Sequence, residues 1–215
     1  MLTLIEQLKK SFIVPIIVLD TIESAVPLAN LLLDEGFHTI EITLRTPCAL
    51  EAIQHITHTV PSMTVGAGTI VTKKQLRQAK QAGAQFAVSP ALSQTLIQEA
   101  SQQQLAYLPG VATPSEALKA QTLGATNLKF FPAEGMGGIN TLSAISAVFP
   151  LLRFFPTGGI NEDNLFSYAT LPSVCAIGGT WIAPPELIRA NAFKEISLRA
   201  RFTQSLLKKS GRSHI

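Results

Sequence analysis

Short runs of apolar, often β-branched residues alternate along the chain with longer segments in which apolar residues recur every three or four positions. The first pattern is typical of strands and the second of amphipathic helices. The apolar runs end near Leu19, Leu44, Ile70, Ser89, Leu108, Phe131, Pro156 and Ile177. The segments with helical spacing are Ala25–Glu35, Ala49–Thr59, Lys73–Ala82, Gln94–Gln103, Ser115–Leu123 and Leu142–Phe149.

Several of these helices carry start and stop signals. Thr113 and Glu116 have the spacing of a capping box, with proline at the first helical position between them, and Thr72 and Gln75 repeat the spacing. Glycines follow three of the helices, where a left-handed residue is wanted, at Gly36, Gly83 and Gly124. A short amphipathic helix is also expected at the N-terminus, from the apolar spacing of Leu4, Ile5, Leu8 and Phe12.

Eight strand–helix units in a chain without a linker predict an α/β fold, specifically a (β/α)₈ TIM barrel with a short N-terminal helix. We expect residues 1–207 to form this single domain and residues 208–215 to be a flexible tail. A doubly wound open sheet is the alternative architecture. Its dinucleotide fingerprint is absent, because the glycines at Gly66 and Gly68 are not followed by a third at Val71.

Lys129 stands in the middle of a run that otherwise has the pattern of a buried strand. Because side chains alternate along a strand, Lys129 shares one face with Asn127 and Phe131, and Pro132 ends the strand since it has no N–H. The amine then points into an apolar interior, where desolvation favours the uncharged nucleophile that Schiff-base chemistry requires. A lysine that reaches the strand end and pairs with a carboxylate is the alternative interpretation.

Polar residues gather at the ends of the predicted strands, where barrels of this kind carry their sites. Glu41, Thr43 and Arg45 alternate with apolar residues, so we expect all three to face the interior. A buried carboxylate is costly alone, so Glu41 is expected to pair with Lys129 there. Two titratable groups in one low-dielectric pocket are typical of acid–base chemistry. Arg45 could bind a substrate carboxylate through its planar fork. The alternatives are a structural ion pair for Glu41 and a surface position for Arg45.

Glycine pairs follow the seventh and eighth predicted strands, at Gly158-Gly159 and Gly178-Gly179-Thr180. Barrels often bind phosphate after these two strands, because glycine lets backbone N–H groups approach the anion. The Thr180 hydroxyl would add a further donor. Tight turns are the alternative explanation.

Composition narrows the possible partners. The 215 residues are 47% hydrophobic and only 14% charged, which suggests that part of the surface is buried between subunits. The net charge of +3 is scattered, so a small anionic ligand is expected and nucleic acid is not. Cys48 and Cys175 are interpreted as reduced thiols of a cytoplasmic protein, and His55 with His58 as a surface pair without a metal. Ile13–Leu19 is too short to cross a membrane, and no signal peptide is recognisable.

Six segments at successive strand ends form one ordered set that spans nearly the whole chain: Glu41-Ile42-Thr43-Leu44-Arg45-Thr46, Val65-Gly66-Ala67-Gly68-Thr69, Phe86-Ala87-Val88-Ser89-Pro90, Leu128 to Glu134, Pro156-Thr157-Gly158-Gly159-Ile160 and Ile177-Gly178-Gly179-Thr180. This set resembles the 2-keto-3-deoxy-6-phosphogluconate (KDPG) aldolase family. The resemblance implies a class I aldolase on a (β/α)₈ barrel, without cofactor or metal, and usually a homotrimer. It also implies cleavage of 4-hydroxy-2-oxoglutarate (KHG) by many members.

The resemblance assigns roles to individual residues. Lys129 matches the Schiff-base lysine, Glu41 the general acid–base glutamate and Arg45 the arginine that binds the substrate carboxylate. The other residues expected to bind the phosphorylated keto acid are Thr69, Pro90, Phe131, Thr157, Gly158, Gly159, Gly178, Gly179 and Thr180. Many relatives have serine where Thr180 stands. Some have arginine at the end of the first strand, where this chain has Val18-Leu19-Asp20.

Two other functions fit parts of the same pattern. One is a phosphate-binding sensor or non-catalytic subunit in which Lys129 and Glu41 form a structural pair. The other is an isomerase or synthase that uses Glu41 as a base without a covalent step.

Overall fold

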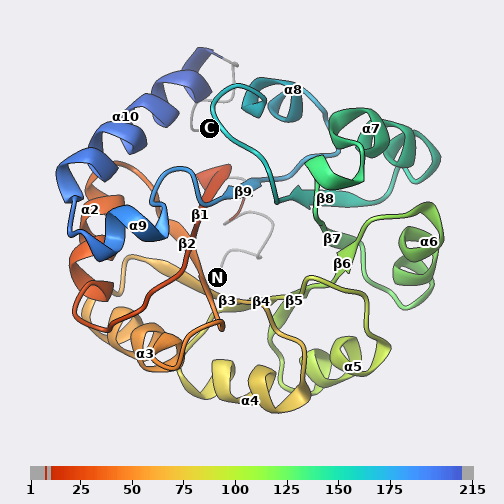
Figure 1. Cartoon of the computed structure of the whole chain (residues 1–215). Coiled ribbons are helices and arrows are strands. Elements are labelled where there is room, and N and C mark those ends of the chain that lie inside the picture. Colours follow the sequence, from red (N-terminus) through yellow and green to blue (C-terminus); the bar gives the residue numbers. More distant parts are fainter. Residues whose placement is uncertain (1–7, 9–10, 210–215) are drawn as a thin grey trace.

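Parallel strands curl around a common centre, and helices lie outside them (Figure 1). This computed structural model describes Leu8 and residues 11–209. The strands are β1 (Ile13–Ile17), β2 (Thr39–Thr43), β3 (Thr64–Gly68), β4 (Phe86–Val88), β5 (Ala106–Leu108), β6 (Gly110–Val111), β7 (Asn127–Phe130), β8 (Arg153–Pro156) and β9 (Ile177–Gly179). The predicted α/β class is therefore confirmed, and a strand lies in or next to each predicted apolar run.

The strands pair in two groups. Six form one sheet in the order β5-β4-β3-β2-β1-β9, and three form another in the order β6-β7-β8. Single parallel bridges extend from β8 toward the chain around β9, between Phe154 and Val174 and between Thr157 and Gly178. The curled sheet thus brings the carboxyl ends of its strands to one side, where the predicted site residues lie.

Pro109 divides the fifth predicted strand into β5 and β6. Proline has no N–H to donate, so the ladder is interrupted at this residue. The Pro109 carbonyl still accepts a hydrogen bond from the backbone N–H of Lys129 at 2.9 Å. The structure therefore has nine short strands in its described part, whereas the apolar runs of the sequence predict eight.

The helices agree with most of the expected segments. They are α2 (Ala25–Asp34), α3 (Ala49–Thr59), α4 (Lys73–Gln81), α5 (Gln94–Gln102), α6 (Pro114–Thr122), η1 (Glu134–Met136), α7 (Gly138–Val148), α8 (Leu165–Ala169), α9 (Pro185–Arg189) and α10 (Phe193–Lys209). Both capping boxes are present, with Thr72 accepting from the Gln75 N–H and Thr113 from the Glu116 N–H. The last three helices were not predicted.

The chain ends differ in part from expectation. Leu8 is helical, but Leu4 and Ile5 of the predicted N-terminal helix lie outside the described residues. Helix α10 includes Lys208 and Lys209, which were expected to belong to the flexible tail, and the rest of that tail lies outside the described residues.

Hydrogen bonds and an ion pair connect helix α10 to the C-terminal end of helix α2. Arg201 Nε lies 2.9 Å from Glu35 Oε2, and Ser197 Oγ donates to Glu35 Oε1 at 2.6 Å. These contacts lower the pKa of Glu35, mainly through the hydrogen bond from Arg201. Gln204 Nε2 also donates to the Gly36 carbonyl at 3.2 Å. Helix α10 thus packs next to α2, although the two helices lie far apart in the sequence.

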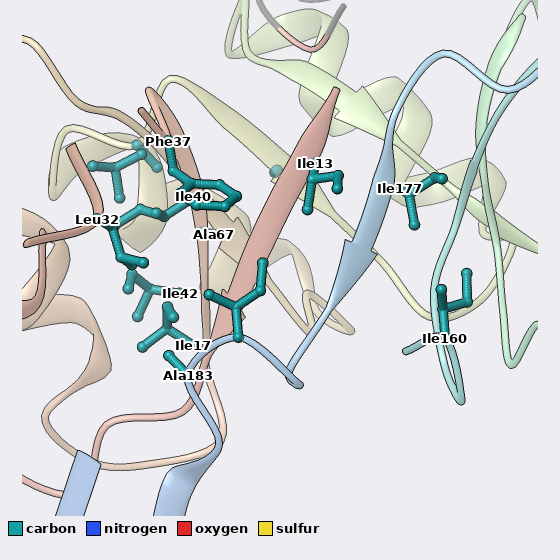
Figure 2. Packing of buried hydrophobic residues seen from close by; sticks show 14 of the residues in the cluster. Ile13, Ile17, Leu32, Phe37, Ile40, Ile42, Ala67, Ile160, Ile177 and Ala183 are labelled. Carbon is teal, nitrogen blue, oxygen red and sulfur yellow. The ribbon is translucent and has the colours of Figure 1, made fainter. Parts of the chain in front are cut away.

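Alternation along the strands separates two apolar clusters. Ile13, Ile17, Ile40 and Ile42 pack on the helix side of the sheet, with residues such as Phe37 covering them (Figure 2). A second cluster lies on the inner face and contains Leu8, Val14, Phe86, Val88, Leu108, Phe155, Cys175 and Ala176. The inner face is therefore largely apolar around the polar site described below.

A buried carboxylate joins helices α4 and α5. Glu99 is 1% exposed and accepts two hydrogen bonds from Arg77, at 2.7 and 2.9 Å. The Arg77 guanidinium holds the pKa of Glu99 at about 2, below the ordinary 4.5, with smaller help from Gln103 and against the effect of burial.

This pair predicts a specific acid dependence of stability. A carboxyl whose pKa is lowered by folding stabilises the native state above its unfolded pKa, and this stabilisation disappears as pH falls toward the native pKa. We expect part of the fall in thermal midpoint between about pH 4.5 and pH 2 to come from Glu99. Glu99→Gln, which cannot titrate, should show a shallower fall over this range. Equal slopes for the two proteins would contradict the assignment.

Candidate active site

Lys129 and Glu41 meet on the inner face of the sheet. Lys129 belongs to β7 and is 6% exposed, and Glu41 belongs to β2 and is fully buried. Lys129 Nζ lies 3.3 Å from Glu41 Oε1. The expected pairing is therefore confirmed. The two residues come from strands that are far apart in the sequence, so the curled sheet, and no local motif, brings them together.

Glycines on β3 make room for this pair. A Cβ added to Gly68 would collide with Glu41 Oε1, and one added to Gly66 would collide with the ring of Phe86. Ala67, between them, packs on the helix side. The Gly-Ala-Gly sequence is therefore explained by close packing on the inner face.

Two buried polar atoms at the site have no hydrogen-bond partner in the described structure: Oε2 of Glu41 and Oγ1 of Thr157. Thr157 follows β8 and is 1% exposed. A buried polar group without a partner costs about 1–3 kcal/mol. Both atoms are therefore available to a bound polar molecule.

A third such atom, the Tyr107 hydroxyl, belongs to the helix side of β5, where its ring packs against the larger apolar cluster. Burial raises the pKa of Tyr107 to about 12, and a weak interaction with Ser89 offsets only part of this effect. The phenol stays protonated at neutral pH and lies on the face opposite to Lys129.

Phe131 places an aromatic ring beside the amine. Lys129 Nζ lies 5.4 Å from the centroid of this partly buried ring, within the range of a cation–π interaction. Phe131 follows Lys129 by two residues, so the two share the inner side of the chain as predicted. The Phe131–Pro132 peptide is cis.

Arg45 is not in the interior, contrary to the expectation from alternation. Strand β2 ends at Thr43, which is buried and donates to the Ile17 carbonyl, and Arg45 lies in the following turn and is exposed. Its Nε nevertheless donates to Thr69 Oγ1 at 3.2 Å. Thr69 has a φ of 61°, a strained conformation for a β-branched residue, of the kind often found at functional sites.

The turn after β8 lies beside the end of β9, and Gly178 and Gly179 belong to that strand and not to a tight turn. Gly158 and Gly159 have φ values of 98° and 83°, which only glycine adopts without strain. The bridge from Thr157 to Gly178 brings the end of β9 next to them. There a Cβ on Gly179 would collide with the Trp181 ring, and Thr180 is exposed. Trp181 is anchored by α10, where Nε1 donates to Thr203 Oγ1 at 3.1 Å.

Pro90 lies at another strand end, two residues after β4. It is partly buried, and its backbone passes so close to Gly110 that a Cβ there would collide with it. The structure therefore brings Pro90 against β6, next to the strand that carries Lys129.

One polar pair near the site was not predicted. Tyr168 of α8 donates a hydrogen bond to Glu134, the first residue of η1, two residues after Pro132. Burial and the neighbouring carboxylate both raise the pKa of Tyr168. No pattern in the sequence links Tyr168 to Glu134, because the contact depends on how α8 lies over η1.

The described residues contain no group of three or more histidine, cysteine, aspartate or glutamate side chains arranged to hold a metal ion. His55 and His58 are exposed on α3, where they help to line a shallow hollow. Among the helices in the described part of the chain, none is long and apolar enough for a membrane span.

Comparisons with known proteins agree with this arrangement. The sequence profile of the aldolases described as KDPG and KHG aldolase matches residues 4–198. The KHG/KDPG aldolase of Escherichia coli K12 is 42% identical over 189 residues, covering 88% of this chain and 89% of that protein. The 2-dehydro-3-deoxy-phosphogluconate aldolase of Dickeya dadantii has the same identity and coverage.

A solved structure extends the match to the fold. The KDPG aldolase of Legionella pneumophila, captured with pyruvate as a covalent carbinolamine intermediate, has a TM-score of 0.89 and 39% identity over 92% of this chain and 96% of that one. The fold, the site and these matches define an aldolase. The chain belongs to the KDPG and KHG aldolase family. The resemblance inferred from the strand-end motifs is thereby confirmed.

Proposed function

We propose that this aldolase cleaves KDPG to pyruvate and glyceraldehyde 3-phosphate, and KHG to pyruvate and glyoxylate. The names of the E. coli and D. dadantii relatives support these substrates. The buried contact between Lys129 Nζ and Glu41 Oε1 carries the proposal, because it places a nucleophile next to a proton carrier and away from bulk water.

The reaction uses these two side chains in sequence. Lys129 Nζ attacks the C2 ketone, and loss of water gives an iminium ion. Glu41 then takes the proton of the C4 hydroxyl while the C3–C4 bond breaks, so that its electron pair neutralises the iminium as an enamine and the aldehyde leaves. Glu41 returns the proton to C3. Hydrolysis of the iminium releases pyruvate and restores Lys129.

The carboxylate end of the substrate is proposed to bind Arg45, Thr69 and Thr157. The unpaired Oγ1 of Thr157 supports this assignment, as does the hydrogen bond that turns Arg45 toward Thr69. Phe131 and Pro90 would line the apolar sides of the pocket. No step in this mechanism uses a metal or another cofactor.

The phosphate end is proposed to bind the turn after β8 and the adjacent end of β9, through Gly158, Gly159, Gly178, Gly179 and Thr180. Left-handed glycines expose backbone N–H groups, which suit an anion. The non-phosphorylated substrate KHG would leave this end empty, so one active site could serve both substrates.

Borohydride reduction in the presence of pyruvate tests the central step. We expect a reduced pyruvate adduct on the peptide that contains Lys129, together with release of pyruvate from KDPG in a coupled assay. Conversion of a sugar phosphate without an adduct and without release of pyruvate would favour an isomerase or synthase that uses Glu41 as a simple base. Ligand binding without turnover would favour a sensor.

We further propose that the strands close into a complete (β/α)₈ barrel over residues 1–207, in a cytoplasmic homotrimer. The bridges from Thr157 and Phe154 support closure next to β9. Exposed apolar side chains support subunit contacts, since each of the following is more than half exposed: Val148, Leu151, Phe166, Leu198 and Phe202.

Thr180→Val tests the phosphate end with little change in volume. Losing one hydrogen bond to a charged group costs about 1.5–3 kcal/mol, so kcat/KM for KDPG should fall roughly ten- to a hundredfold. Cleavage of KHG should barely change, because Lys129, Glu41 and Arg45 are untouched. Steady-state kinetics on both substrates measure the difference. Equal losses on both would contradict a phosphate role for Thr180.

A further inference from the structure

The turn that follows β8, residues 157–160, is here called the glycine turn. Its first two carbonyl groups accept hydrogen bonds from the backbone N–H groups of Ala133, at 2.8 Å, and Glu134, at 3.0 Å. The third carbonyl, that of Gly159, accepts a hydrogen bond from the side chain of Asn164, with Nδ2 at 3.1 Å. Three successive carbonyl groups are therefore held by donors outside the turn.

Holding the carbonyl groups also fixes the direction of the N–H groups. In a planar trans peptide the C=O and the following N–H point in opposite directions. The N–H groups of Gly158, Gly159 and Ile160 therefore point away from the three donors. The parallel bridge between Thr157 and Gly178 engages the Gly158 N–H, because the Thr157 N–H already donates to the Phe130 carbonyl. Among the described residues, the N–H groups of Gly159 and Ile160 donate to no backbone carbonyl. These two adjacent groups are free donors of the kind that binds an anion.

Asn164 is itself oriented before any ligand binds. Its Oδ1 accepts a hydrogen bond from the Asn161 N–H at 2.9 Å, which leaves Nδ2 directed at Gly159. The residue that follows, Leu165, is buried and begins α8. Asn164 is the only one of the three donors that uses its side chain, because Ala133 and Glu134 donate through the backbone. A substitution can therefore remove the hydrogen bond from Asn164 but not the other two.

We infer that Asn164 is a positioning residue for the substrate phosphate, because it holds the Gly159 carbonyl and thereby aims the Ile160 N–H, next to that of Gly159, at the anion. The inference rests on the proposed function, which assigns the phosphate to the glycine turn. Without this restraint, two consecutive glycines have wide conformational freedom, and ordering them again would cost binding energy. Asn164 does not touch the substrate.

The test compares Asn164→Ala and Asn164→Ser with the parent protein. Serine keeps a short polar side chain suited to the start of α8 but is too short to reach Gly159. We expect KM for KDPG to rise about three- to tenfold in both variants, the effect of one lost hydrogen bond. The inhibition constant of inorganic phosphate against KDPG cleavage should rise by a similar factor. The kinetics of KHG cleavage should stay unchanged.

Thr72→Ala is the matched control, because it removes a side chain that caps a helix, α4, which follows a different strand. It should lower the thermal midpoint without changing the ratio of the KM values for the two substrates. Unchanged KM for KDPG in both Asn164 variants, or equal losses on KDPG and KHG, would overturn the inference. Failure of the proposed function is distinguishable, because the parent protein itself would then show neither KDPG cleavage nor inhibition by phosphate.

Discussion

Lys129→Met is expected to abolish aldol cleavage of both substrates, with kcat lower by about 10⁴-fold or more, the scale seen when a covalent nucleophile is removed. Methionine keeps an unbranched apolar side chain but cannot attack the C2 ketone. Borohydride and pyruvate should then leave the protein unmodified. Pyruvate release measured at high enzyme concentration sets the residual rate.

The same substitution leaves the Glu41 carboxylate buried without its cation. Breaking a buried ion pair costs about 3–5 kcal/mol, so Lys129→Met should also be less stable. The double variant Lys129→Met/Glu41→Gln is the control, because it removes both charges. It should regain most of the stability and none of the activity. Activity in either protein within a hundredfold of the parent would exclude Lys129 as the nucleophile.

Glu41→Gln is expected to separate imine formation from turnover. The amide keeps the shape of the side chain and an oxygen near Lys129, but it cannot accept and return the C4 hydroxyl proton. Loss of a positioned acid–base group typically costs about 10²–10⁴-fold, so kcat should fall by at least about 10²-fold on both substrates. Borohydride should still trap pyruvate on Lys129, although more slowly.

A comparison of KDPG and KHG sharpens this result. The defect in Glu41→Gln should be similar for the two substrates, because the proton transfers occur at C3 and at the C4 hydroxyl that both possess. Thr180→Val, in contrast, should discriminate between them. Near-normal turnover in Glu41→Gln would move the proton transfers to another group.

The repeated strand and helix pattern was predictable because apolar spacing and capping signals act locally. Lys129 and Glu41 were also predictable, since alternation along two parallel strands directs both side chains to the inner face. Helix α10 was missed although it carries a usable signal: Ile196, Ala200 and Leu207 recur at helical spacing and are buried. The same apolar spacing that predicts the earlier helices therefore also predicts α10.

Other features depend on backbone geometry that the sequence does not encode locally. Alternation failed for Arg45 because β2 ends two residues earlier and the chain turns. The positive φ of Thr69 is unusual for threonine, so no propensity predicts it. The hydrogen bond from Asn164 to Gly159 requires the turn to be built first. Local patterns therefore predict which strand ends form the site. The positions of the residues around the site depend on the path of the folded backbone.

The contact between α10 and α2 affects how fast the chain can fold. Arg201 and Glu35 are separated by 166 residues in the sequence, and Lys129 and Glu41 by 88. Contacts between such distant residues require long loops to close before they contribute, which slows folding. During synthesis, β9 and α10 leave the ribosome long after β1 and α2, although β1 pairs with β9 and α2 packs against α10. The edge of β1 that pairs with β9 therefore stays unpaired until β9 has been synthesised, and an unpaired edge can associate with another chain in that interval.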